Sequence, residues 1–221
     1  MEPGTYDRSS MKIAKFNIFK LYYYFMIKKI PIILAVFLVL ILLPINLFSF
    51  DEGFYHSEFS KYGIYSMFNE DINSEFNKVL VYLDNGDKIE EDFFNDKERE
   101  HLKDVRILFV IKDILIFLSV LTIFISGFVL KKNEFLNSLN IGGLATLIFI
   151  VILGLFSLFN FDSVFIKFHE IFFNNNLWLL NPETDNLIIL LPQEIFFDIL
   201  KRSLLLSFIL SLIVINLRKI I

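Results

Sequence analysis

The sequence contains no cysteine, and this absence removes several kinds of chemistry. Disulfide bonds, thiolate catalysis and cysteine-ligated zinc all require that side chain. The chain also lacks a Gly-x-Ser-x-Gly turn, a glycine-rich phosphate loop and a basic patch. Covalent serine or cysteine catalysis and nucleic-acid binding are therefore without support.

Apolar residues, in contrast, are abundant. Hydrophobic residues make up 55% and aromatic residues 17% of the 221 positions, and the mean hydropathy is +0.60, which exceeds the average of soluble domains. Four apolar runs are each long enough, as helices, to cross a hydrocarbon core of about 30 Å. They cover residues 30–50, 105–130, 141–161 and 194–217. The sequence predicts an all-α membrane protein with four transmembrane helices.

The segregation of charge predicts the orientation of these helices. Basic residues gather at Arg8, Lys12, Lys15, Lys20, Lys28, Lys29, Lys131, Lys132, Arg218 and Lys219. Residues 51–106 instead carry 15 acids and 7 bases. By the positive-inside rule the basic segments are cytoplasmic and the acidic ones are outside. The expected cytoplasmic segments are 1–29, 131–140 and 218–221, and the expected segments of a small extracellular cap are 51–104 and 162–193. Residues 1–10 are interpreted as an extension or a disordered tail.

The first outer segment shows the apolar spacing of a helix over residues 72–83. Asn85 and Gly86 stop this pattern in the way of a helix C-cap. An alternative interpretation makes residues 84–87 a hairpin turn between short strands.

A second helix is expected to begin near the end of the same segment. Asn95 and Glu98 have the spacing of a capping box. The helix would then run through His101 directly into the second apolar run, so His101 would lie where an outer helix meets the membrane surface.

The second outer segment contains an apolar stripe at helical spacing, formed by Val164, Phe165, Phe168, Ile171 and Phe172. Such a helix is expected to lie in the plane of the membrane interface. Trp178 and a turn over residues 181–185 follow, and Pro192 is expected in the first turn of the last helix.

His101 and Asp104 are spaced i, i+3, which places them on one helix face. The carboxylate could then accept a hydrogen bond from one ring nitrogen and leave the other nitrogen as a base. The alternative is that His101 is only a polar residue in a charged stretch and that Asp104 is solvated.

His169 differs, because Phe165, Phe172 and Phe173 surround it on its own helix. Burial disfavours the charged imidazole and keeps it available as a neutral base. The alternative is an interfacial histidine whose polar edge reaches water.

A zinc site formed by His56, His101 and His169 is chemically permissible, but no metal-binding spacing supports it.

Ionisable residues within the apolar runs are expensive unless they pair or reach water. They are Lys112, Asp113, Lys201 and Arg202. Arg202, if it pointed into the bundle, could hold a phosphate or an oxyanion. The glycines of the apolar runs, Gly127, Gly142, Gly143 and Gly154, are interpreted as positions of close helix packing.

Two stretches together resemble the bacterial lipoprotein intramolecular transacylase family. One is Phe94-Asn95-Asp96-Lys97-Glu98-Arg99-Glu100-His101-Leu102-Lys103-Asp104-Val105-Arg106, and the other is Phe168-His169-Glu170-Ile171-Phe172-Phe173 with Trp178, Asn181-Pro182 and Asp185-Asn186-Leu187-Ile188 after it. The resemblance runs from about the first apolar run to the C-terminus.

This resemblance implies a four-helix enzyme of the bacterial plasma membrane, with its active site at the extracellular face and a diacylglyceryl-modified lipoprotein as substrate. Such an enzyme moves the sn-2 acyl chain to the α-amino group of the N-terminal cysteine and leaves a lyso-form lipoprotein. The two catalytic histidines of the family match His101 and His169, with Asp104 in support. Phe168, Phe172, Phe173, Trp178, Asn181, Asp185 and Arg202 are the expected substrate-binding residues. No metal or organic cofactor is implied.

Two other functions are compatible with the same residues. A membrane lipid hydrolase could use the histidine pair with water as the nucleophile. A small sensor or assembly factor could instead bind another membrane protein through its cap, and its histidines would then tolerate replacement.

Overall fold

The computed structural model describes residues 8–89 and 93–220, and the regular elements of this part are all helical. In chain order they are α1 (Arg8–Ser49), α2 (Glu52–Lys61), the short 3-10 helix η1 (Ile64–Ser66), α3 (Ile72–Asn85), α4 (Asp96–Val129), α5 (Lys132–Phe159), α6 (Phe161–Phe172), α7 (Asn186–Leu190) and α8 (Gln193–Ile220). Residues 1–7 of the expected tail lie outside the described residues.

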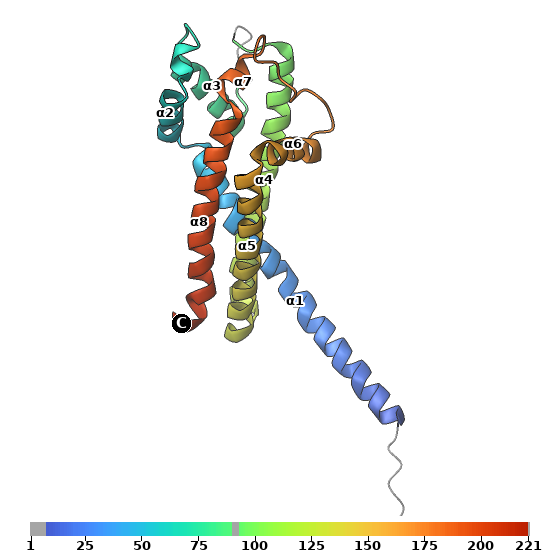
Figure 1. The fold of residues 1–221 in the computed structure, drawn as a ribbon. Coiled ribbons are helices and arrows are strands. Elements are labelled where there is room, and N and C mark those ends of the chain that lie inside the picture. Colours follow the sequence, from blue (N-terminus) through green and yellow to red (C-terminus); the bar gives the residue numbers. More distant parts are fainter. Residues whose placement is uncertain (1–7, 90–92, 221) are drawn as a thin grey trace, which may run out of the picture.

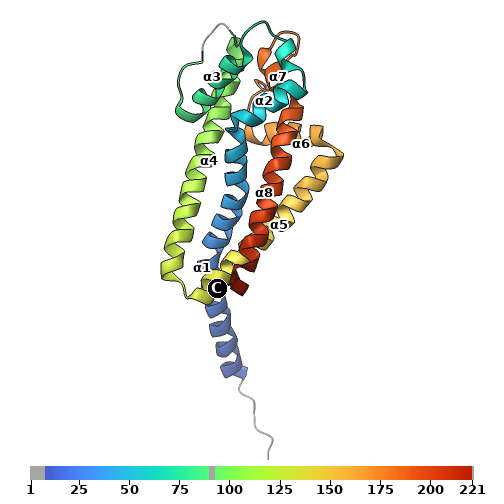
Figure 2. The same ribbon diagram turned by 90° about the vertical axis from the view of Figure 1, so that its left-hand side faces the viewer.

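The four long helices α1, α4, α5 and α8 form a bundle, and the short helices gather at the end opposite the C-terminus (Figures 1 and 2). Within the described residues, three helices are long and apolar enough to cross a membrane: Ile27–Ser49, Asp96–Val129 and Lys132–Phe159. The predicted class, an all-α membrane protein, is confirmed. The fourth crossing, by α8, stays a prediction.

Two glycines allow the helices of the bundle to approach closely. A Cβ atom added to Gly142 would lie 2.8 Å from Cβ of Val36, and one added to Gly143 would lie 3.1 Å from Cγ1 of Ile215. The predicted close packing is therefore confirmed at these two positions. Added Cβ atoms at Gly127 and Gly154 would make only ordinary contacts, at 3.7 Å and 3.6 Å.

Residues 131–140 are not the predicted loop, because α5 already begins at Lys132; their cytoplasmic location stays a prediction. Leu136 and Leu139 of this stretch are buried against α1. Their burial stabilises the helical conformation of the first turns of α5, although these turns also contain polar residues. The first helix is also longer than predicted, since α1 begins at Arg8 and not at residue 30.

The cap contains the predicted helix α3, which ends at Gly86 with φ 86°. This left-handed conformation suits glycine, and the alternative hairpin turn is wrong. Helix α2 was not predicted. It packs Phe54, Tyr55 and Phe59 into the same apolar core as α3.

The helix beginning at Asn95 is confirmed together with its reciprocal capping box. The predicted interfacial helix is present as α6. Pro192 lies immediately before α8 and not in its first turn, and its carbonyl oxygen accepts a hydrogen bond from the Ile195 N–H at 3.1 Å.

Three of the four ionisable residues predicted within the apolar runs, Lys112, Asp113 and Lys201, are paired, which lowers the cost of a charge in an apolar environment. The Lys112 ammonium donates to Oδ1 of Asn46 and lies 3.2 Å from Oδ1 of Asp113. Lys201 forms an ion pair with Asp198.

Candidate active site

His101 and His169 lie side by side although they are far apart in the sequence. His101 is on the second turn of α4 and His169 is near the end of α6, and their ring centroids are 6.0 Å apart. Both side chains are buried, with exposed fractions of 6% and 8%. Two imidazoles at this separation can act on the same small group of reacting atoms.

An aromatic box encloses His169. Its ring centroid lies 4.4 Å from that of Phe165, 4.9 Å from that of Trp178 and 5.5 Å from that of Phe173. The Nδ1 atom is 2.7 Å from the backbone oxygen of Phe165. Because a carbonyl oxygen can only accept, Nδ1 carries the hydrogen, and the neutral ring keeps its lone pair on Nε2. Nε2 is therefore the atom of His169 that can take a proton.

Burial lowers the pKa of His169, although the hydrogen bond to Phe165 opposes this effect. A lowered pKa means that protonation requires a more acidic solution, so the ring stays neutral at and above the ordinary value of about 6.5. We expect ¹⁵N NMR of labelled histidine rings to give a midpoint below 6.5 for His169, with His169→Ala assigning the signal. A midpoint above 6.5 would contradict this assignment of the base.

His101 is held differently. Its Nδ1 atom is buried and has no hydrogen-bond partner among the described residues, and its ring meets that of Phe173 edge-on at 5.1 Å. The predicted hydrogen bond from the His101 ring to the Asp104 carboxylate is absent among the described residues, and Oδ2 of Asp104 instead accepts one from Nδ2 of Asn175 at 2.8 Å. An i, i+3 spacing allows contact but does not require it, and the loop after α6 supplies the competing donor.

Two of the predicted substrate-binding residues, Phe172 and Arg202, contribute less than expected or lie elsewhere. Phe172 is 52% exposed and packs on Phe168, whose own ring reaches His169 at 5.5 Å. Arg202 is exposed, with its guanidinium 4.3 Å from the centre of the Phe54 ring. Arg202 therefore does not point into the bundle. Its guanidinium instead makes a cation–π contact with the Phe54 ring of α2.

Asp185 and Asn181 belong to a hydrogen-bonded junction between the loop after α6 and the start of α4. Asp185 is 4% exposed, and its carboxylate accepts hydrogen bonds from the Asn181 N–H at 2.8 Å, Thr184 Oγ1 at 3.0 Å and Asn95 Nδ2 at 2.9 Å. The bond from the Asn181 backbone is the main reason that the pKa of Asp185 is lowered. This junction ties the loop that carries Trp178 to the start of α4.

Glu98 completes the junction, a role that its capping-box spacing did not predict. Its side chain is buried, and its two oxygens accept hydrogen bonds from the backbone N–H groups of Leu187 at 2.5 Å and Asn95 at 2.7 Å. Lys97 adds a bond to the Leu179 oxygen at 2.5 Å. The bond from Asn95 is that of the predicted capping box. The bonds to Leu187 and Leu179 join distant segments, so no local pattern could have found them.

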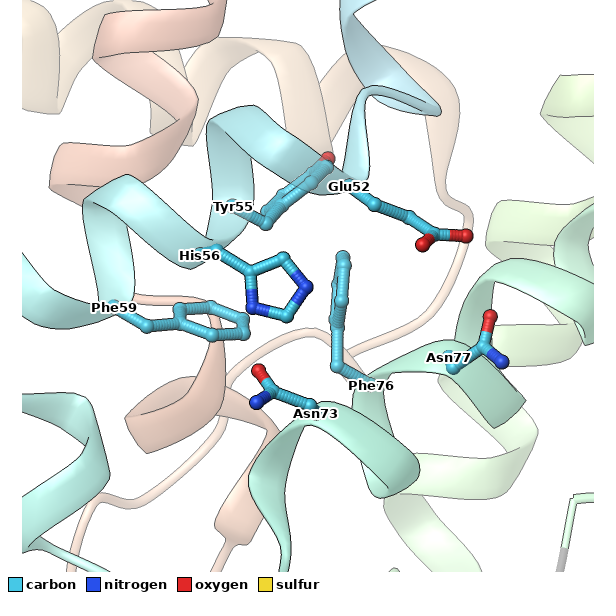
Figure 3. A pocket seen from close by; sticks show the side chains of 7 residues that line it. All are labelled: Glu52, Tyr55, His56, Phe59, Asn73, Phe76 and Asn77. Carbon is cyan, nitrogen blue, oxygen red and sulfur yellow. The ribbon is translucent and has the colours of Figure 1, made fainter.

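His56 lies apart from this pair. It is on α2, where Nδ1 is 3.0 Å from the Tyr65 hydroxyl, and it lines a small pocket with Glu52, Phe76 and Asn73 (Figure 3). Among the described residues, no three histidine, aspartate or glutamate side chains lie close enough to hold a metal ion. The three-histidine site is therefore not assembled.

The fold and the site define a multi-pass helical membrane protein with two buried imidazoles where the bundle meets its cap. A family model described as lipoprotein intramolecular transacylase Lit matches residues 30–197. The chain belongs to this family. A comparison with curated proteins finds no match.

Solved structures agree with this assignment at the level of the fold. The integral membrane lipoprotein intramolecular transacylase Lit of Bacillus cereus superposes with a TM-score of 0.81 and 21% identity, over 90% of this chain and 95% of its own. Two variants of that protein, with one histidine replaced by arginine or by alanine, give TM-scores of 0.77 and 0.76 at 20% identity. They cover 94% and 92% of this chain and 96% of their own chains.

Proposed function

We propose that this protein moves the sn-2 acyl chain of a diacylglyceryl-modified bacterial lipoprotein to the α-amino group of its N-terminal cysteine. The observation that carries the proposal is the buried pair of His101 and His169, 6.0 Å apart, in a chain of the transacylase family. The products are an amide and a free sn-2 hydroxyl, which together make the lyso-form lipoprotein.

The reaction needs one proton to be removed and one to be delivered. The amine nitrogen attacks the ester carbonyl, the bond from that carbon to the glyceryl oxygen breaks, and the amine proton replaces the lost acyl group on that oxygen. His169 takes the amine proton on Nε2, since Nδ1 is engaged by the Phe165 carbonyl. Burial lowers the pKa of His101 to about 4, so its ring is neutral. It accepts the proton from His169 on one nitrogen and releases the proton of its other nitrogen to the glyceryl oxygen, which returns both rings to their starting state. Its unpartnered Nδ1 supports a direct contact with substrate.

Holding the substrate in the reactive geometry supplies much of the rate. The atoms from the amine nitrogen through the cysteine and glyceryl carbons to the ester carbonyl close a ring of about eight members in the transition state. Phe165, Phe173 and Trp178 support this arrangement, because their packed rings confine the space around His169. No metal or organic cofactor takes part in the proposed steps.

The same proposal includes an orientation in the membrane. We place the histidine pair at the extracellular face of the bacterial plasma membrane, with four crossings and both termini in the cytoplasm. The segregation of Lys and Arg described above supports this orientation, as does the position of α2, α3, α6 and α7 at the end opposite the C-terminus (Figure 1). The lipoprotein and the surrounding membrane lipid are then the partners.

Mass spectrometry of a lipopeptide incubated with the protein tests the proposal. We expect an N-acylated lyso-lipopeptide of unchanged total mass, whose fragments carry one acyl chain on the amine. Release of free fatty acid would instead support a lipid hydrolase. An unaltered lipopeptide would point to a sensor or assembly factor.

A further inference from the structure

The proposed reaction needs a third group besides a base and an acid. When the amine nitrogen attacks, the π electron pair of the ester carbonyl moves onto its oxygen, and the oxyanion that forms requires a hydrogen-bond donor. His169 and His101 are both engaged in moving the proton from the amine to the glyceryl oxygen. The donor must therefore be another group beside the histidine pair.

Trp178 is the one further ring beside His169 that carries a polar hydrogen, within the part of the chain that the structure describes. The other rings that contact His169 are those of His101, Phe165, Phe168 and Phe173. The indole N–H of Trp178 makes no hydrogen bond with the described residues, and its nitrogen is accessible. This N–H is therefore available to a bound substrate.

Helix α4 holds the loop around Trp178 on both sides. Three residues before Trp178, Nδ2 of Asn175 donates a hydrogen bond to Oδ2 of Asp104 at 2.8 Å. One residue after it, the backbone oxygen of Leu179 accepts a hydrogen bond from Nζ of Lys97 at 2.5 Å. The indole is thus fixed to α4 by a polar contact at either end of a short segment.

The two anchors of this loop flank His101. Lys97 lies four residues before His101 and Asp104 lies three residues after it, so the three side chains share one face of α4. On its other side, the indole of Trp178 is nearly parallel to the His169 ring, with an angle of 30° between the planes. The indole is therefore held relative to both imidazoles before substrate binds. A donor that is fixed in advance needs no reorganisation during the reaction.

One substrate can contact both the indole and the base. Hydrogen bonds of about 2.9 Å on either side of an amine and a carbonyl that are about 3 Å apart bridge two nitrogens separated by up to about 8 Å. The ring centroids of His169 and Trp178 are 4.9 Å apart. A substrate whose amine donates to His169 can therefore accept a hydrogen bond from Trp178 at its carbonyl oxygen.

We infer that the indole N–H of Trp178 donates the hydrogen bond that stabilises the oxyanion of the tetrahedral intermediate, an inference that rests on the proposed function. The indole keeps its hydrogen throughout the reaction. When the intermediate collapses, the electron pair on the oxygen forms the carbonyl again and the bond to the glyceryl oxygen breaks. Trp178 then acts on the transition state, and not only on the shape of the pocket.

Replacing the indole N–H by sulfur tests this inference at a single position, because Trp178 is the only tryptophan of the chain. Benzothienylalanine has nearly the shape of tryptophan but no N–H. We expect kcat for lyso-lipopeptide formation to fall about 10²- to 10³-fold, the usual loss for one oxyanion donor, with KM unchanged. A ring-fluorinated tryptophan retains the N–H and should keep the wild-type kcat. Trp178→Phe should lower kcat at least as far as benzothienylalanine.

The NMR signal of the indole N–H gives a readout that does not depend on turnover. One signal is expected, since the chain has one tryptophan. A lipopeptide with a phosphonate in place of the sn-2 ester presents an anionic oxygen where the oxyanion would form. We expect this analogue to shift the indole proton downfield, because a charge-assisted hydrogen bond forms. An analogue with an sn-2 ether has no such oxygen and should shift the signal less.

The outcomes separate this inference from the proposed function. A wild-type kcat in the benzothienylalanine protein overturns the inference alone. So does a higher KM at unchanged kcat, which is the result for a ring that only binds substrate, and so does a bound phosphonate that leaves the indole signal in place. A wild-type protein that forms no lyso-lipopeptide overturns the proposed function on which the inference rests.

Discussion

Replacing either His101 or His169 by alanine is expected to reduce acyl transfer about 10²- to 10⁴-fold, the usual contribution of general acid–base catalysis. Each imidazole handles a different proton, so the loss of either leaves the transfer incomplete. The double variant should be little worse than either single variant, because groups that act together give non-additive losses. The rate of lyso-lipopeptide formation by mass spectrometry is the measurement.

Two substitutions serve as controls for this result. His56→Ala should leave the rate almost unchanged, since His56 lies on α2 and is exposed, and its ring contacts the Tyr65 hydroxyl. Asp104→Asn should cost less than either histidine variant, because Asp104 hydrogen-bonds Asn175 and not His101. Persistence of lyso-lipopeptide in the double histidine variant would show that these residues do not carry the reaction.

The second large effect is expected at Glu98, through stability as well as rate. Glu98→Ala leaves the buried N–H group of Leu187 without its acceptor, which costs about 1–3 kcal/mol, and also removes the acceptor of the partly buried Asn95 N–H group. A total of about 3 kcal/mol lowers the melting temperature by roughly 6–12 °C in a chain of this size. Thermal unfolding in one detergent measures this change.

The rate should fall as well at a temperature where the variant is folded. Glu98 and Asp185 join the start of α4, which carries His101, to the loop that packs Trp178 on His169. A displacement of about 1 Å between catalytic groups can cost about 10²-fold. Glu98→Gln retains one acceptor oxygen and should be intermediate in both measurements.

Glu100→Ala is the matched control for this prediction. Glu100 lies on the same helix and is exposed, and among the residues that the structure describes its carboxylate pairs only with Lys103, at 2.5 Å. Its removal should change neither the melting temperature nor the rate appreciably. Equal melting temperatures for Glu98→Ala and Glu100→Ala would refute the structural role of Glu98.

Much of the fold could be predicted because its signals are local. Long apolar runs, the Asn95 and Glu98 capping box and Gly86 as a helix stop each act within a few residues along the chain. The apolar stripe of α6 belongs to the same group, because its helical spacing is present whatever the helix contacts. The family resemblance likewise rested on short stretches around His101 and His169.

Only the tertiary structure decided which side chains meet. It brought His169 beside His101, paired Asp104 with Asn175 and placed Arg202 over Phe54. Which partner each of these side chains contacts depends on the donors, acceptors and rings that other segments bring near it. The spacing of residues within one segment does not contain that information. The sequence by itself determined that the chain forms long apolar helices and that helices begin after Asn95 and end at Gly86, because propensity and hydropathy depend on residues close together in the chain. It did not determine where α1 and α5 begin. The geometry of the site followed from packing, which involves residues far apart in the chain.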